Sequence, residues 1–395
     1  MNIIEFVKEK GIYSFEEVPF GEVDSLVLCQ LVYLKMEKIV PSETGTSGVY
    51  ISDILEHELY ETIYGDERYA SINREFFESL SKSNRYGKLK LNNFVDVIDD
   101  TVDVQFAAMT VTDEKGFDYI VFRGTDDHVV GWREDLNMTF KIPVPAQTYA
   151  ASYLERVATD IHGNFYVGGH SKGGNLAVYS SMKSPRDIRK RIISIFSHDG
   201  PGFRHELVEG KEYEEIRGRI RKYVPKDAIV GMFGNAEEFL VVECEKHGRR
   251  QHNPYNWIID DFEFRKTEHI GKYSAMKADA ILSWAADMST DDWALLSDNL
   301  FGVFDEAGVT NLNEFNDDFL GTLAKLKMAA DNVDSESKAK VKDIIDRFVD
   351  HASIVAKSEA KETMTKASEA MSQITEKAHL GKKTRHRGIV GNTKK

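Results

Sequence analysis

The sequence contains little cysteine and no long apolar run. Its 395 residues include only Cys29 and Cys244, which excludes a scaffold held by several disulfides, and we expect both thiols to be reduced. No stretch approaches the length of a membrane-spanning helix, and the first residues lack the apolar core of a signal peptide. We therefore expect a cytoplasmic protein.

Positive charge is also in short supply, because 51 Lys and Arg residues face 65 Asp and Glu residues, for a formal net charge of -14. A general nucleic-acid-binding surface needs clustered Lys and Arg, so we expect no nucleic acid partner. No glycine-rich phosphate loop ends in Lys and Ser or Thr, and His247 and His252 lack the further ligands of a metal site. We therefore expect neither a cofactor nor a metal.

The hydrophobic content of 42% is ample for one large core with an appendage. Strand-like runs alternate with helical runs up to about residue 243, and this alternation predicts an α/β fold with a mostly parallel sheet and helices on both faces. Beyond about residue 270 only helical patterns follow. We expect an α/β domain over 1–270 that begins with a helical segment, an all-helical extension over 271–380 and a disordered basic tail over 381–395.

The expected elements can be placed individually. Strands are predicted at 104–111, 119–122, 165–169, 192–196, 220–224 and 239–243, the first two as a hairpin, and helices at 147–161, 174–182, 295–304, 315–326, 341–355 and 356–380. Residues 41–100 are mixed and polar, with helical periodicity around 51–64 and 72–80.

The run Gly169-His170-Ser171-Lys172-Gly173 carries the strongest chemical signal. It follows a short apolar strand and precedes an Ala-rich helix. In that setting a Gly-x-Ser-x-Gly turn exposes the serine oxygen and lets strand and helix approach closely. It also points the helix N–H groups at developing negative charge. We therefore predict that Ser171 is the nucleophile of a serine hydrolase with an α/β-hydrolase fold.

The acid and the base should follow the serine in the order Asp, then His. Asp227 comes just after a strand-like run, where a carboxylate can orient an imidazole, and Asp199, at the end of the preceding strand, is the rival. His252 lies in a loop after the last strand of the core, and His247, in a charged run, is its rival. We predict Asp227 as the acid and His252 as the base.

The tetrahedral intermediate of acyl transfer needs N–H donors for its oxyanion. One is the N–H of Lys172, next to the nucleophile. The other is predicted at Thr125, after a strand that ends in Arg123 and Gly124, because glycine permits close approach and Thr125 also has a hydroxyl. The Lys172 side chain is expected to be solvated, with only its N–H in use.

These motifs resemble a known family. Similarity to the class 3 (fungal-type) lipases lies in Phe122-Arg123-Gly124-Thr125, Trp132, Asp135-Leu136 and the Ser171 motif. A closer resemblance, to bacterial Mbeg1-like proteins, lies in Pro19-Phe20-Gly21-Glu22-Val23-Asp24-Ser25-Leu26, Asp199-Gly200-Pro201-Gly202-Phe203 and Gln251-His252-Asn253-Pro254.

The resemblance spans roughly residues 15–265 and implies a lipase-like α/β-hydrolase core with a triad at Ser171, Asp227 and His252. Two departures stand out. Lys172 replaces the Leu common after the serine in lipases, and the segment 128–146, where lipases carry a lid, is polar. Both departures argue against triglyceride hydrolysis at an oil interface.

We expect hydrolysis of a carboxylic, acyl or lipid-like ester through an acyl-enzyme, with a small-molecule acyl ester as substrate. A thioesterase, amidase or acyltransferase could use the same triad, because fold and triad do not fix the acyl donor. Outside enzymes, the alternative is a scaffold that acts through its C-terminal helices.

The C-terminal helices also raise the question of partners. An apolar stripe must be buried either on the chain's own core or in a homo-oligomer, and the basic tail could contact an acidic membrane face or lipid. The stripe consists of Val341, Ile344, Ile345, Phe348, Val349, Ala352 and Val355.

Overall fold

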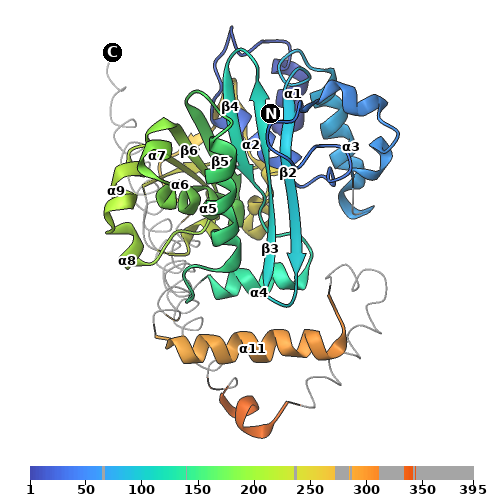
Figure 1. Ribbon diagram of the computed structural model, residues 1–395. Helices are drawn as coiled ribbons and strands as arrows, with labels where there is room; N and C mark the ends of the chain where they lie inside the picture. The colour runs from blue at the N-terminus through green and yellow to red at the C-terminus, as the bar shows by residue number, and fades with distance from the viewer. Residues whose placement is uncertain are drawn as a thin grey trace, which may run out of the picture.

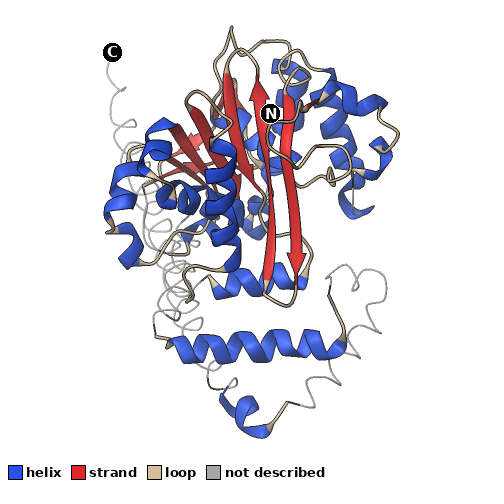
Figure 2. Cartoon of the chain, in the orientation of Figure 1, coloured by secondary structure: helices blue, strands red, loops and turns tan. Residues whose placement is uncertain are grey.

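The computed structural model describes residues 1–64, 67–138, 140–234, 238–271, 284, 287–310, 333–340 and 343. A nine-stranded sheet forms the centre of this part of the chain, and helices lie against it (Figures 1 and 2). The sheet order is β1-β2-β3-β4-β5-β6-β7-β8-β11. The strands are β1 (Val49–Tyr50), β2 (Lys90–Asp99), β3 (Val104–Asp113), β4 (Phe117–Phe122), β5 (Phe165–His170), β6 (Ile192–His198), β7 (Ile220–Pro225), β8 (Phe239–Val242) and β11 (Lys266–Thr267).

The five strands β4 to β8 run parallel, and they form the part of the sheet that carries the candidate site. The strands β1 to β4 pair antiparallel, as does β11 on β8. A separate two-stranded ribbon joins β9 (Ile259–Asp260) to β10 (Glu263–Phe264). The predicted hairpin of β3 and β4 and the predicted parallel strands are confirmed.

The strand β2 was not expected from the sequence. Its pairing with β3 shifts register between Asn92 and Val95, and Asn93 adopts a positive φ of 53°. A bulge of this kind breaks the alternation of apolar and polar residues by which a strand is recognised in a sequence. The predicted helical stretch around 51–64 is also wrong, since only the short 3₁₀ turns η1 (Ser52–Glu56) and η2 (Tyr60–Thr62) form there.

Alternate residues of β3 and β4 point to opposite faces of the sheet. On one face Phe106 and Phe122 join an apolar cluster with α5 (Pro145–Ala158) and α6 (Lys172–Lys183). On the other face Met109 joins a cluster with α1 (Ile3–Lys10), α2 (Glu22–Leu31) and α3 (Glu67–Lys82). Helices therefore cover both faces, as expected. Other helices in the described ranges include α4 (Val129–Asn137), α7 (Arg186–Arg191), α8 (His205–Val208), α9 (Lys211–Arg217) and α11 (Thr290–Ala307), and residues 335–340 are also helical. Further 3₁₀ turns are η3 (Val230–Met232), η4 (Gly248–His252) and η5 (Pro254–Asn256).

A buried ion pair fixes the N-terminal segment to the core. Arg85 donates from Nε and Nη2 to the two carboxylate oxygens of Asp24, both at 2.7 Å, and the Tyr86 hydroxyl donates to the same carboxylate at 2.6 Å. Bidentate pairing satisfies both charges without solvent. This anchor holds α2, and with it the residues that follow α2, against the sheet.

The helix α11 lies alongside α4 (Figure 1). Ser297 donates a hydrogen bond to Asn137 at 3.1 Å, and the rings of Trp293 and Phe140 stack with centroids 6.1 Å apart. This helix confirms the pattern predicted over 295–304. The helices predicted at 315–326, 341–355 and 356–380 and the tail at 381–395 lie outside the described residues, apart from Asp343. No helix in the described ranges combines the length and apolar composition needed to cross a membrane.

Candidate active site

The chain turns sharply at Ser171, between β5 and α6. Ser171 has φ 58° and ψ -132°, a region that side-chain-bearing residues rarely occupy. A Cβ atom at Gly169 would lie 2.2 Å from the backbone of Gly173, and one at Gly173 would lie 2.2 Å from the Phe122 carbonyl oxygen. Both glycines are thus required for the strand and the helix to approach this closely. The turn is the strand–turn–helix elbow of an α/β-hydrolase.

A serine, a histidine and an aspartate form a hydrogen-bonded series at this elbow. Ser171 Oγ lies 2.9 Å from His252 Nε2, and His252 Nδ1 lies 2.6 Å from Asp199 Oδ2. The second oxygen of Asp199 accepts the N–H of Gly231 at 3.0 Å, and its side chain is only 1% exposed. Because a carboxylate can only accept, Nδ1 of His252 carries the proton and Nε2 accepts from the serine hydroxyl. The arrangement can remove a proton from Ser171.

Asp227, the acid predicted from the sequence, does not reach His252. Its carboxylate accepts the N–H of Gly248 at 2.8 Å and the Gln251 side-chain amide at 3.1 Å, and its own N–H donates to Gln251 Oε1 at 2.7 Å. Asp227 therefore stabilises the loop that ends in His252, and the carboxylate that contacts the imidazole is that of Asp199.

The strand order explains this correction. Asp199 follows β6, which is the neighbour of β5, the strand that leads to Ser171, whereas Asp227 follows β7, one strand further away. Both acids satisfy the order Ser, Asp, His along the chain, so chain order could not separate them. The sequence did contain one signal in favour of Asp199, namely the turn-forming run Asp199-Gly200-Pro201-Gly202. In the structure Asp199 makes a tight turn there, with a positive φ of 50°.

The turn after β4, where the sequence predicts the oxyanion site, lies against Ser171. A Cβ atom at Gly124 would lie 2.9 Å from Ser171 Cβ and 2.6 Å from the His170 carbonyl oxygen. The next residue, Thr125, donates its hydroxyl to Asp135 Oδ2 at 2.7 Å, so this hydroxyl is already engaged within the protein. Lys172 opens α6, where a backbone N–H has no carbonyl one turn earlier to accept it.

The Lys172 side chain is buried, contrary to the solvated state expected from the sequence. It is 2% exposed, and its Nζ donates to Glu134 Oε2 at 2.9 Å, to the Gln105 carbonyl at 2.9 Å and to Gln105 Oε1 at 3.2 Å. Glu134 is fully buried, and its other oxygen accepts the N–H of Ala146 at 2.7 Å. All three ammonium donors are thus satisfied. The partners are far away in the sequence, so no local pattern reveals this ion pair.

Asp135 has an unusual electrostatic environment. Burial raises its pKa to about 6, against the lowering effects of the Lys172 charge and of the Thr125 hydrogen bond. Its Oδ2 receives the Thr125 hydroxyl, whereas its Oδ1 is buried without a partner in the described part of the chain. A carboxyl group that is half satisfied in this way favours its neutral form.

The raised pKa predicts a pH-dependent stability. The folded protein binds the Asp135 proton more tightly than the unfolded chain, whose carboxyl has a pKa of about 3.9. Stability contributed by that proton is therefore present at low pH and lost as the pH rises from about 4 through about 6. Asp135→Asn, which cannot ionise, should lose less stability than the wild type between about pH 4.5 and about pH 7.5. Urea unfolding at both pH values measures the difference, and an equal change in the two proteins would contradict the shift.

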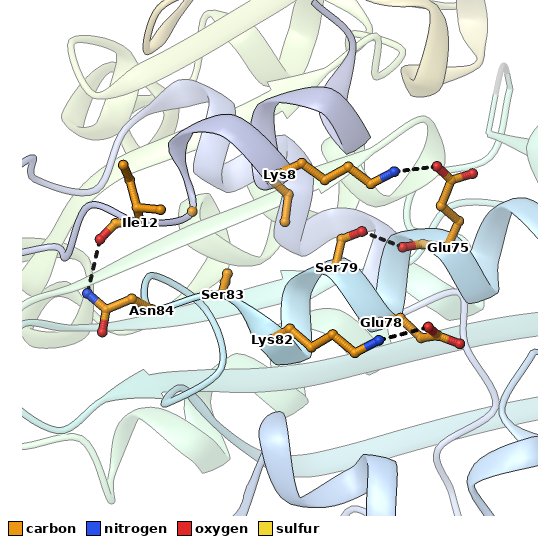
Figure 3. Close-up of a pocket in the computed structure, with 10 residues that line it drawn as sticks. Lys8, Ile12, Glu75, Glu78, Ser79, Lys82, Ser83 and Asn84 are labelled. Carbon is orange, nitrogen blue, oxygen red and sulfur yellow. Dashed lines mark hydrogen bonds and ion pairs between the residues drawn. The ribbon is translucent and has the colours of Figure 1, made fainter.

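A shallow pocket elsewhere in the molecule has no link to this site. It lies between α1 and α3 (Figure 3), and neither helix contributes to the elbow. Its charged groups pair with one another, Lys8 with Glu75 at 2.6 Å and Lys82 with Glu78 at 3.0 Å. The described ranges contain no group of three or more His, Cys, Asp or Glu residues placed to hold a metal ion. Cys29 and Cys244 are both free thiols, as expected.

The sequence matches the model of a known protein family. A model described as Mbeg1-like matches residues 80–302, which is more than half of the chain. No curated protein matches the sequence.

Among solved structures, M37 lipase is 14% identical, with 54% of this chain and 70% of that one covered, and its TM-score is 0.35. A fungal lipase in an inhibitor complex is 17% identical, with 50% and 81% covered and a TM-score of 0.28. A Rhizomucor miehei lipase in a propeptide complex is 16% identical, with 59% and 84% covered and a TM-score of 0.31. Because these TM-scores are low, the α/β-hydrolase fold rests on the sheet topology and the elbow of this chain itself.

Proposed function

This chain belongs to the Mbeg1-like family, and we propose that it is a serine hydrolase that cleaves carboxylic esters of acyl or lipid-like compounds. One observation carries the proposal, namely the hydrogen-bonded series from Ser171 through His252 to Asp199 at the elbow. In this proposal Asp199 takes the role that the sequence assigned to Asp227. Thr125 and Lys172 keep their roles at the oxyanion site.

The first half of the reaction forms an acyl-enzyme. Ser171 Oγ attacks the acyl carbonyl carbon while His252 Nε2 takes the hydroxyl proton. The carbonyl oxygen becomes an oxyanion that receives the N–H groups of Thr125 and Lys172. When the carbon–oxygen bond to the leaving alcohol breaks, His252 returns the proton to that alcohol. Asp199 stabilises the imidazolium throughout.

The second half regenerates the enzyme. A water molecule replaces the alcohol, gives its proton to His252 and attacks the acyl carbon of the ester on Ser171. The second tetrahedral intermediate uses the same oxyanion donors. It collapses to a carboxylic acid as the proton passes from His252 to Ser171 Oγ.

The contacts of the Lys172 side chain restrict the proposed role of this residue to its backbone N–H. Its ammonium group is held by Glu134 and Gln105 inside the protein, so it is not available to bind an anionic substrate. Its proposed contribution to catalysis is the backbone N–H at the start of α6. Substrate recognition therefore does not depend on a free positive charge at this residue.

The test is turnover of p-nitrophenyl esters of graded acyl length by the full chain, with Ser171→Ala as the background. We expect saturable ester hydrolysis well above this background, with one acyl length preferred. A matched thioester and anilide, assayed at the preferred length, establish whether the ester is the favoured acyl donor. Turnover no greater than that of Ser171→Ala on every ester would overturn the proposal, and a preference for the thioester or anilide would reassign the substrate class.

A further inference from the structure

Two side chains outside the triad, Tyr33 and His170, connect the turn at Gly124 with the loop that ends in His252. Tyr33 lies just after α2, in the N-terminal segment, and His170 is the last residue of β5. The Tyr33 hydroxyl lies 3.1 Å from the N–H of Gly124 and 3.2 Å from His170 Nδ1. His170 Nε2 lies 2.8 Å from the carbonyl oxygen of His252. A continuous series of hydrogen bonds thus runs from the oxyanion turn to the base.

We propose that Tyr33 and His170 are positioning residues that fix the oxyanion turn at Gly124 and the backbone of His252 relative to each other. This inference rests on the proposed function, since it assigns a role in the same reaction. Neither side chain takes part in the chemical steps of that reaction. Their effect is on the placement of Thr125, next to Gly124, and of the imidazole of His252.

The direction of every hydrogen bond in the series follows from one group. The carbonyl of His252 can only accept, so Nε2 of His170 carries a proton. In the neutral ring Nδ1 is then the acceptor, and the Tyr33 hydroxyl must donate to it. The Tyr33 oxygen in turn accepts the N–H of Gly124. No donor faces a donor, and each group in the series has one consistent role.

The surroundings keep both side chains in these states. His170 is only 5% exposed, and burial holds its pKa well below the usual range, so the ring stays neutral. Burial also raises the pKa of Tyr33, so its hydroxyl keeps its proton. The rings of His170 and His252 lie with centroids 4.7 Å apart, which brings the neutral ring directly beside the base.

Gly124 is part of the same hydrogen-bond series, and the absence of a side chain at this position is required. A Cβ atom there would lie 2.4 Å from the Tyr33 hydroxyl oxygen and 2.9 Å from Ser171 Cβ. The turn therefore occupies the space between the tyrosine and the nucleophile with no room for a side chain. Any movement of Tyr33 would be transmitted to the backbone that presents Thr125.

The experiment compares Tyr33→Phe with Tyr153→Phe in the full chain. Tyr153 is a matched control because it is also a tyrosine with a bonded hydroxyl, which donates to the Asn93 carbonyl at 2.8 Å, but it contacts no member of the series. We expect Tyr33→Phe to lower kcat by about 10- to 100-fold with KM changed less than about threefold, because positioning acts in the transition state. Tyr153→Phe should stay within about twofold of the wild-type kcat. Similar kcat values for the two variants would overturn the inference.

A double-mutant cycle tests whether the two residues act as one unit. His170→Leu alone should lower kcat by about 10- to 100-fold, and Tyr33→Phe combined with His170→Leu should fall little below the worse single variant. Fold losses that multiply would show independent roles and contradict the inference. Thermal unfolding checks that each variant folds, and Tyr33→Phe decides the matter alone if His170→Leu does not.

A readout without turnover separates this inference from the proposed function. In protein labelled with nitrogen-15 at histidine, the ring nitrogens of His170 are assigned from the signals that His170→Leu removes or, if that variant does not fold, from their couplings to the backbone. At about pH 7 we expect a neutral ring protonated at Nε2. A proton on Nδ1 would overturn the inference even if the ester assay succeeds. Absence of ester turnover in the wild type would overturn the proposed function while this measurement still decides the hydrogen-bond series.

Discussion

Asp199→Asn is expected to lower kcat/KM for ester hydrolysis by about 10⁴-fold, whereas Asp227→Asn should lower it less than about tenfold. In the asparagine variant Oδ1 can still accept the N–H of Gly231, which leaves the amide NH₂ facing His252 Nδ1. Because the amide NH₂ donates, Nδ1 of His252 must accept that hydrogen bond, and the ring proton moves to Nε2. An imidazole protonated at Nε2 cannot take the proton of Ser171.

The Asp227 variant is a matched control, because it makes the same chemical change in a carboxylate that follows the neighbouring strand β7 and contacts the loop that ends in His252. Asp227 receives the N–H of Gly248 and the amide of Gln251, and an asparagine retains one acceptor oxygen. Steady-state kinetics of both variants on the preferred ester measure the difference. If Asp227→Asn were the more damaging change, the pairing of His252 with Asp199 would not be the catalytic one.

Lys172→Met should destabilise the folded protein by about 3–5 kcal/mol, because it leaves the Glu134 carboxylate buried without its counter-charge. The ammonium group of Lys172 and this carboxylate are 2.9 Å apart and almost fully shielded from solvent. Methionine fills nearly the same volume as lysine, so the loss isolates the charge from the effect of a cavity. Urea unfolding of the two proteins at neutral pH gives the free-energy difference.

A second substitution tests the reason for that loss. Glu134→Gln in the Lys172→Met background removes the unpaired charge, while the glutamine oxygen can still accept the N–H of Ala146. We expect the double variant to recover at least about half of the lost free energy, because a buried charge costs more than a buried amide. A double variant no more stable than Lys172→Met would show that something other than the unpaired carboxylate causes the loss.

The sharp turn at Ser171 and the parallel core could be predicted because their signals are local. Ser171 stands in a short motif between a strand and a helix, and those three pieces adjoin in the chain. His252, predicted as the base, also lies within hydrogen-bond distance of Ser171, and its loop after the last parallel strand was the local signal. In both cases the sequence neighbours of the residue carry the information.

The carboxylate partner of His252 and the Lys172 ion pair depend instead on contacts between distant segments. Choosing Asp199 over Asp227 requires knowing that β6, and not β7, lies beside β5. The burial of Lys172 requires knowing that α4 brings Glu134 against the start of α6. Neither fact follows from spacing, charge or periodicity along the chain. The strand β2 was missed for a different reason, because its bulge near Asn93 disrupts the pattern itself.

We propose that Ser171 is a nucleophile activated by His252. Reaction of the full chain with a fluorophosphonate, followed by mass analysis of the intact protein and of its peptides, tests this role. The predicted result is a single adduct located on Ser171, absent from Ser171→Ala and formed much more slowly by Asp199→Asn. An adduct on another residue, or no adduct under conditions that label a control serine hydrolase, would contradict it.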